Sequence, residues 1–365
     1  MAGRCTAMGL KTGFAHYAAR QPHVLIAEAP GGWLQRAALE RRALRWGWHL
    51  AENPADADVL AICGTPGPEL TEMIGRVWDQ LPGPRSGVGL VGPDTDDAEI
   101  DAALDRARFY LADTAAQRSD ARERRAPHIE SDTRDNHEMD HAAMDHAAMD
   151  HGAMDHAAMD HGDMQMAPSG IPLAGGGPDR DGLEMDVLDV RLGPVLRHWP
   201  AGLVVRCSLQ GDLIVDAQAW TLDAGQAPPP PPRHARTEAA RECDRLASLL
   251  FLAGWPHAGT RARRVRDLLL TTDRPALDEL DALTRLVTRS RIFGWSMRGI
   301  TDGHHARLAR ARALLTGWAA PADTATTPAD LPERVVGREM AAARLVVAGL
   351  DVLEPTPAQP EADGG

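Results

Sequence analysis

Five copies of one five-residue unit are the part of this sequence best suited to chemistry. Each copy reads Met-Asp-His followed by two residues that are mostly Ala or Gly, and the copies begin at Met139, Met144, Met149, Met154 and Met159. Each copy offers a thioether and an imidazole beside its carboxylate, and thioether and imidazole are soft or borderline donors, which select copper-group ions over magnesium or calcium. The repeat therefore predicts a metal site that favours copper, with nickel or zinc as alternatives. Its expected ligands are His137, Met139, His141, Met144, His146, Met149, His151, Met154, His156, Met159, His161, Met164 and Met166.

The five-residue period also predicts how this stretch is organised. Five residues advance a helix by about 500°, so successive His residues share no helix face, and an odd period alternates faces in a strand. Because the repeat has no branched or aromatic residue to bury, we expect it to be disordered until a metal binds. Flexible donors of this kind suit storage, buffering or delivery of an ion better than catalysis. A low-complexity linker with an accidental donor pattern is the alternative interpretation.

The other candidate groups favour simpler interpretations. The four cysteines lie far apart and form no Cys-x-x-Cys pair, which argues against a zinc knuckle or a local iron–sulfur motif. Residues 29–32 lack the glycine patterns of nucleotide-binding loops. The adjacent His304 and His305 are interpreted as a helix start, because neighbours on a helix diverge by about 100°. The arginine run at residues 261–266 is interpreted as a solvated helix face, with binding to an acidic partner as the alternative.

Composition narrows the function classes. The chain has 365 residues, 44% of them hydrophobic, and a formal net charge of −13. The length permits two or three domains with real cores, and the negative charge disfavours DNA or RNA as a partner. No signal-like apolar segment and no run of about 18 apolar residues occurs. We therefore expect no direct membrane insertion and a cytoplasmic location, free or on the cytoplasmic face of the plasma membrane.

The elements that must position these groups fall into two halves. Residues 21–115 alternate short apolar strands with helices, which predicts an α/β domain with a flavodoxin-like parallel sheet and a ligand crevice at the carboxyl ends of its strands. Residues 116–182 are expected to be a disordered linker that carries the repeat. Residues 183–320 predict a mainly helical α+β domain with a β-hairpin, and residues 321–365 a helix and a disordered tail. The expected strands are 23–27, 47–50, 58–63, 87–91, 185–192, 202–209 and 213–217; the expected helices are 33–46, 69–81, 96–112, 237–252 (capped by Thr237), 259–270, 275–292 and 304–318.

The first half resembles the small, cluster-bearing subunit shared by respiratory NADH:quinone oxidoreductase (complex I) and [NiFe] hydrogenases. The resemblance is carried by the strand 23–27, by the strand 58–64 that ends in Gly-Thr, and above all by Trp-Asp-Gln-Leu-Pro-Gly-Pro at 78–84 leading into 87–92. In that family a similar passage leads the chain towards an iron–sulfur site.

The second half resembles the large subunit of the same complexes. Residues 186–194 are similar to its opening strand and Gly-Pro turn, and residues 203–217 to the following hairpin. Residues 238–250 are similar to its core helix, and residues 298–300 to an Arg-Gly turn. The two stretches cover roughly two-thirds of the chain.

Several departures from the family pattern decide the functional expectation. Ala29-Pro30-Gly31-Gly32-Trp33 stands where the small subunit places cluster cysteines, and Pro93-Asp94, again without a thiol, comes directly after the 87–92 strand. Because an iron–sulfur cluster needs thiolates, and Cys63 alone cannot hold one, no iron–sulfur cluster is expected. The second half has no cysteine pair for nickel and iron. His198 is the one candidate for a catalytic position, with a structural histidine as the favoured interpretation.

We therefore expect a non-catalytic, accessory subunit that assembles with the membrane subunits of a respiratory or hydrogenase-like complex and carries a metal-binding tether. The alternatives are an active subunit that contributes to quinone reduction through His198, and a cytoplasmic copper-binding or storage protein.

Overall fold

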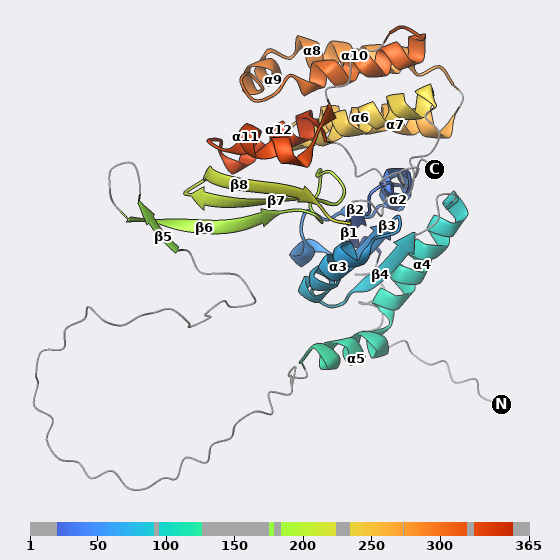
Figure 1. Cartoon of the computed structure of the whole chain (residues 1–365). Coiled ribbons are helices and arrows are strands. Elements are labelled where there is room, and N and C mark those ends of the chain that lie inside the picture. Colours follow the sequence, from blue (N-terminus) through green and yellow to red (C-terminus); the bar gives the residue numbers. More distant parts are fainter. Residues whose placement is uncertain are drawn as a thin grey trace, which may run out of the picture.

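Four parallel strands with helices on both faces make up the first half of the chain (Figure 1). The strands are β1 (His23–Glu28), β2 (His49–Leu50), β3 (Val59–Cys63) and β4 (Ser86–Leu90), in the order β2-β1-β3-β4. The computed structural model describes residues 20–90, 95–125, 175–178, 184–223, 234–272, 274–319 and 325–352. Every residue of β1 and β3 is buried or half-buried, as expected of parallel strands that are covered on both faces.

Two helices cover one face of this sheet and one covers the other. Leu39 of α2 (Trp33–Arg45) and Leu104 of α4 (Asp97–Ala112) share a buried cluster with Val59 of β3. Leu70 of α3 (Pro68–Gln80) packs on the opposite face with Leu25 of β1. The strands and helices predicted for residues 23–112 are all present, with ends within two residues of the predicted ones. A short 3₁₀ turn, η1 (Pro54–Asp56), precedes β3.

The α/β unit, defined as described residues 20–125, is longer than predicted. Residues 116–125 were assigned to the linker because they are charged and poor in apolar residues, but they lie in α5 (Thr114–Arg125). Asp113 caps this helix by accepting hydrogen bonds from the N–H groups of Ala115 and Ala116, at 2.9 and 3.1 Å. Polar contacts hold α5 in place, since Arg85 pairs with Asp120 at 2.9 Å. Polar anchoring of this kind leaves no apolar periodicity in the sequence.

An antiparallel sheet opens the second half. Its strands are β5 (Gly175–Pro178), β6 (Glu184–Leu192), β7 (Leu203–Gln210) and β8 (Leu213–Thr221), in sequential order. The predicted hairpin is confirmed: β7 and β8 are joined by Gly211 and Asp212, with Gly211 in the left-handed region at φ 63°. β5 falls inside the predicted linker, where its Gly-rich sequence gave no strand signal.

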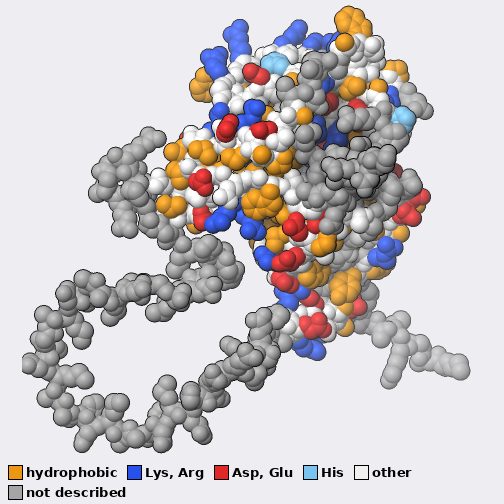
Figure 2. Space-filling model, in the orientation of Figure 1, with side chains coloured by type: hydrophobic (Ala, Val, Ile, Leu, Met, Phe, Trp, Pro, Cys, Tyr) orange, Lys and Arg blue, Asp and Glu red, His pale blue; other side chains and the backbone are white. Residues whose placement is uncertain are grey.

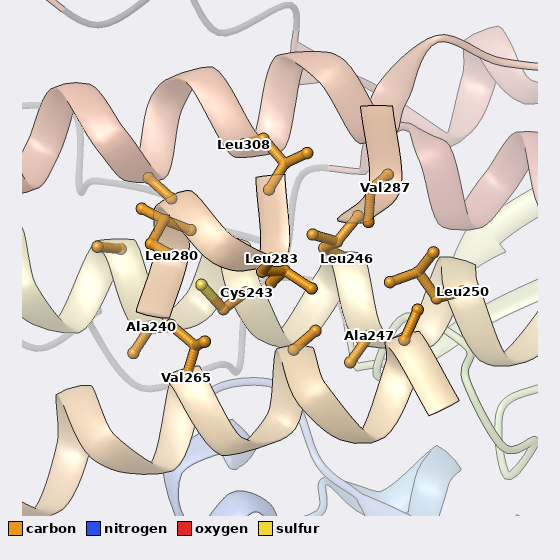
Figure 3. Packing of buried hydrophobic residues seen from close by; sticks show 14 of the residues in the cluster. Ala240, Cys243, Leu246, Ala247, Leu250, Val265, Leu280, Leu283, Val287 and Leu308 are labelled. Atoms are coloured by element: carbon orange, nitrogen blue, oxygen red, sulfur yellow. The ribbon is translucent and has the colours of Figure 1, made fainter. Parts of the chain in front are cut away.

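Five helices form the largest core of the second half (Figure 3). They are α6 (Ala235–Leu252), α7 (Pro256–Thr271), α8 (Leu277–Arg289), α9 (Arg291–Ser296) and α10 (Gly303–Thr316). Figure 3 shows Cys243 and Leu246 of α6 packed against Leu283 of α8 and Leu308 of α10. The central helix α6 is therefore buried on more than one side.

Several predicted helix boundaries in the second half were wrong, and α7 begins three residues before its predicted start at 259. Thr237 does not cap α6, because the helix begins two residues earlier and His234 occupies the cap position. The predicted helix over 275–292 is split, since α8 ends at Arg289 and Ser290 starts α9 by accepting a hydrogen bond from the Phe293 N–H at 3.3 Å. A serine that caps locally competes with continuation of the preceding helix.

The C-terminal described segment belongs to the same unit. It contains β9 (Ala325–Thr326), the 3₁₀ turn η4 (Pro328–Asp330), α11 (Leu331–Val335), α12 (Met340–Gly349) and β10 (Asp351–Val352). Leu331 and Val347 are buried with Leu203 and Ile214 of the antiparallel sheet. The predicted boundary between residues 320 and 321 therefore does not separate two cores, and we call described residues 184–352 the helical unit. The disordered tail predicted for residues 354–365 lies outside the described residues.

The two units share a core as well as a boundary. Val204 of β7 and Leu222 are buried in one cluster with Leu25 and Leu70 of the α/β unit. Asp223 caps α3 from the other unit, accepting from the N–H groups of Glu69 and Leu70 at 3.0 and 3.1 Å. Acidic and basic side chains are interspersed over the face shown in Figure 2. None of the described helices is long and apolar enough to cross a lipid bilayer.

Candidate functional site

A cavity of about 130 Å³ lies where the α/β unit meets the helical unit. Residues of β1, α2 and β2 line it from one unit, and the β6–β7 loop, α6, α12 and β10 line it from the other. Space of this size holds several water molecules or one small polar molecule. The charged residues around it fall into two groups.

The first group is a balanced set of ion pairs, which we call the central ion network. Arg36 of α2 bonds to Asp244 of α6 at 2.5 Å and to Glu40 at 3.1 Å, and also bonds to Glu28 of β1. Arg266 of α7 bonds to Asp244 and Glu40 at 2.6 and 2.7 Å. Arg263 of α7 also pairs with Glu40, at 3.4 Å. The central ion network therefore joins the two units through buried charges.

Two carboxylates of this network, those of Asp244 and Glu40, are held ionised. Burial alone would raise the pKa of Asp244, but Arg36 and Arg266 outweigh it and lower the pKa to about 2. Burial likewise opposes ionisation of Glu40, and Arg263, Arg36 and Arg266 hold the pKa of Glu40 well below its usual value. Burial would lower the pKa of Arg266, but the carboxylates of Glu40 and Asp244 outweigh it and raise that pKa. These groups are poor proton donors or acceptors at neutral pH, so their role is to hold the interface.

The second group, which we call the cationic cluster, comes from α6, α10 and β10 of the helical unit. It contains Arg241, Arg245, Arg307 and Arg310, together with the carboxylates of Glu242 and Asp351. Arg307 is 1% exposed and bonds to Asp351 at 2.8 Å, and Arg245 bonds to the same Asp351 oxygen at 2.5 Å. Burial, Arg241 and Arg307 lower the pKa of Arg245 in spite of Asp351.

His198, the predicted catalytic candidate, lines the cavity from the β6–β7 loop. Its backbone is in the left-handed region at φ 61°, which is uncommon for a residue with a side chain. Its ring stacks on Phe251 with centroids 5.0 Å apart. Burial, Arg197 and Arg263 lower the pKa of His198 to about 3, so the imidazole is neutral at physiological pH.

The three described cysteines lie in three different cores and not at the cavity. Cys63 is buried in the parallel-sheet core, Cys207 in the antiparallel-sheet core and Cys243 between the helices. Burial raises the pKa of Cys207 to about 11 and that of Cys243 to about 12, and it also raises the pKa of Cys63. The fourth thiol, Cys5, lies outside the described residues.

The turn after β1, where the family resemblance would place cluster ligands, is filled by protein. A Cβ added at Gly32 would lie 2.9 Å from the Cys63 carbonyl carbon, so this glycine lets α2 start directly against the end of β3. Trp33, the next residue, is buried in the core of the helical unit. Residues 91–94, which follow β4, lie outside the described residues.

The structure separates the other predicted candidates. The thirteen predicted metal ligands, from His137 to Met166, all lie outside the described residues. His304 and His305 stand at the start of α10, as predicted; His304 is buried beside Phe293, with ring centroids 4.9 Å apart. Within the described part of the chain, no group of three or more His, Cys, Asp or Glu side chains is arranged to hold a metal ion.

The charged interface was not predicted from the sequence. The arginine run 261–266 was interpreted as a solvated helix face, but Arg263 and Arg266 are 9% and 1% exposed, and of the run only Arg264 is exposed. Residues three apart share a helix face, so the spacing placed 263 and 266 together and 264 away from them. Glu40 interrupts the apolar pattern of α2 with an acidic residue, and this was the sequence signal for a buried partner of those arginines.

Comparisons of this chain with protein family models, with curated proteins and with solved structures found no match.

Proposed function

We propose that this protein is an accessory subunit of an electron-transfer complex of the complex I or hydrogenase type, with no redox chemistry of its own, and that its Met- and His-rich repeat binds copper. The proposal joins the resemblance of the two halves to the way in which they pack. The order β2-β1-β3-β4 is the order of the first four strands in flavodoxin-like sheets, which supports the expected small-subunit-like half.

The buried pairing of Arg36 with Asp244 and Glu40 with Arg266 is the observation that carries this proposal. The two halves are joined by buried, fully paired charges, which resist separation because each unpaired partner would be left in a dry interface. The two halves of this chain resemble two subunits that are partners in such complexes, and the two halves pack together here. The chain is therefore suited to take the place of that pair of subunits in a larger assembly. The filled turn at Gly32 and Trp33 supports a structural role for that region.

Purification from native membranes tests the accessory role. The tagged full-length chain is expected to co-purify, after mild detergent extraction, with membrane subunits of a respiratory or hydrogenase-like complex. Its own preparation should contain neither iron nor acid-labile sulfide in stoichiometric amounts. A chain that purifies without such subunits, or that carries iron and sulfide, contradicts the proposal.

The copper-binding tether is tested separately. Equilibrium dialysis of the full chain with copper(I) should show several bound ions per chain, and deletion of residues 137–166 should remove that binding while circular dichroism of the folded units stays unchanged. Binding should weaken below about pH 6, since imidazole must be neutral to bind metal. Unchanged stoichiometry after the deletion would refute the tether. Copper binding without any membrane partner would instead favour the storage function.

A role in quinone reduction is the second candidate, and the position of His198 in the interface cavity favours it. The neutral imidazole of His198 can donate one hydrogen bond to a carbonyl oxygen. Under this candidate His198→Ala would abolish quinone reductase activity of the assembled complex while leaving assembly intact. Under the accessory role the same variant leaves that activity unchanged.

A further inference from the structure

The outer end of the helical unit carries large apolar side chains in contact with water. Ile292 and Trp295 of α9 are 81% and 72% exposed. Figure 1 shows α9 at one end of the pair formed by α8 and α10, with α6 and α7 between that pair and the α/β unit. This surface therefore takes no part in the contact between the two units.

The exposure of these two residues follows from the packing of α9. Phe293 and Met297 are 4% and 3% exposed and lie in the core of the helical unit, where the Phe293 ring contacts that of Trp255 with centroids 5.4 Å apart. Residues three or four apart share a helix face. The burial of Phe293 and Met297 on one face therefore leaves Ile292 and Trp295 together on the other.

Basic side chains surround this apolar pair. No acidic residue occurs between Asp281 and Asp302, and the stretch between them carries four exposed arginines: Arg285, Arg289, Arg291 and Arg298. Within the part of the chain that the structure describes, none of the four forms an ion pair. Arg338 joins them from the turn between α11 and α12, since its Nη1 donates a hydrogen bond to the Gly299 carbonyl oxygen at 3.0 Å. We call Ile292, Trp295 and these five arginines the basic tip, and Figure 2 shows basic side chains gathered at the upper left, where Figure 1 places α9.

The opposite end of the same helices has a different character. Asp278, Glu279 and Asp281 lie near the start of α8, about 20 Å along the helix from the basic tip, and Arg312 of α10 pairs with Asp281. Trp318, which follows α10, is 80% exposed at that end. An exposed tryptophan is thus present at both ends, and only the basic tip combines it with unpaired arginines.

We propose that the basic tip binds the surface of an anionic lipid bilayer, with Ile292 and Trp295 in the interfacial layer and the arginines on lipid phosphates. Guanidinium groups bind phosphate oxygens through two parallel hydrogen bonds. Tryptophan is favoured at the level of the headgroups, because its ring is apolar and its N–H is polar. Four or more basic residues beside exposed apolar side chains are typical of peripheral binding to acidic lipids.

The net charge of −13 does not oppose this contact. Salt screens exposed charges beyond about 8 Å at physiological ionic strength, so the side chains at the tip decide the local field. An acidic protein would satisfy the arginines, but it would also need a pocket shaped for two protruding apolar side chains. A fluid bilayer accepts such side chains without a preformed pocket, so the tip fits a lipid surface better than an acidic protein.

Flotation of the full-length chain with lipid vesicles, in the presence of a chelator, tests the proposal. The chain should bind vesicles made of equal parts of phosphatidylcholine and phosphatidylglycerol, and it should not bind vesicles of phosphatidylcholine alone. Added salt should release it, because salt screens the attraction between the arginines and the lipid. Absence of binding to the mixed vesicles, or equal binding to both kinds, overturns the proposal. The vesicles contain no protein and the chelator removes copper, so failure here is distinct from failure of the accessory role or of the tether.

Two pairs of variants locate the binding surface. Trp295→Ala should weaken binding to the mixed vesicles by about tenfold or more, because a large apolar side chain no longer enters the interface, whereas Trp318→Ala should leave it unchanged. Arg289→Gln should weaken binding by about fivefold, and Arg274→Gln, which removes an exposed arginine just before α8, should not. Equal weakening within either pair would overturn the assigned surface.

Two further readouts complete the test. All four replaced side chains are exposed, so the thermal unfolding of each variant should match that of the wild type. If the wild type does not bind the mixed vesicles and Trp295→Ala abolishes co-purification of a membrane subunit, the basic tip contacts a protein and the lipid proposal is overturned.

Discussion

Replacement of Arg266 by methionine is the sharpest test of the charged interface. Arg266 is 1% exposed and bonds to both Glu40 and Asp244. Its removal leaves two buried carboxylates with fewer positively charged partners. Removing one partner of a buried ion pair lowers the free energy of unfolding by about 3–5 kcal/mol. Because Arg36 and Arg263 still pair with these carboxylates, we expect a decrease in the free energy of unfolding at the lower end of this range, about 3 kcal/mol at pH 7.

The pH dependence gives this prediction a signature that a packing defect would lack. The pKa of Asp244 is lowered from 3.8 to about 2, which corresponds to roughly 2 kcal/mol of stabilisation at neutral pH. Because the pKa is lower in the folded state, the stabilisation is present above about pH 4 and is lost as the pH falls towards 2. At pH 3 about half of it remains, so the difference between wild type and Arg266→Met should shrink by about half.

Urea unfolding at pH 7 and pH 3 measures both quantities. Tryptophan fluorescence and circular dichroism should report one common transition, which justifies a single free energy of unfolding. Arg264→Met, an exposed neighbour on the same helix, is the control and should change that free energy by no more than about 0.5 kcal/mol. A loss below about 1 kcal/mol for Arg266→Met, or the same loss at both pH values, would refute the role assigned to the central ion network.

Three further predictions follow from the packing. The three described cysteines should resist Ellman's reagent in the folded protein and react once it is unfolded, because they are buried and their pKa values are raised; rapid reaction of more than one thiol in the native chain would contradict this. Asp223→Ala should lower the free energy of unfolding by about 1–2 kcal/mol in urea, since it removes the cap of α3; an effect no larger than that of an exposed surface substitution would argue against the cap. Gly32→Ala should destabilise by about 1–3 kcal/mol through its clash with Cys63, whereas Gly75→Ala in α3 meets no atom within 4 Å and should stabilise by about 0.5–1 kcal/mol; thermal unfolding of both variants checks the opposite signs.

The sequence by itself determined the local elements. Runs such as 24–27 and 59–63 are apolar, with Pro or Gly within a few residues of their ends, and this is enough to specify buried strands at those positions. The hairpin at Gly211 and the helices of the second half were predicted on the same grounds. Each of these signals is local, because it depends on the periodicity of neighbouring residues.

Only the tertiary structure decided which charged residues are buried and where the two units meet. Arg36, Asp244 and Arg266 are 22 to 230 positions apart, and nothing in a single segment indicates that they share one site. The same holds for α5, which is anchored by Arg85 and Asp120, and for the cationic cluster. A buried charge is stable only beside its partners, so its burial depends on the packing of distant segments and leaves no periodic pattern in the sequence.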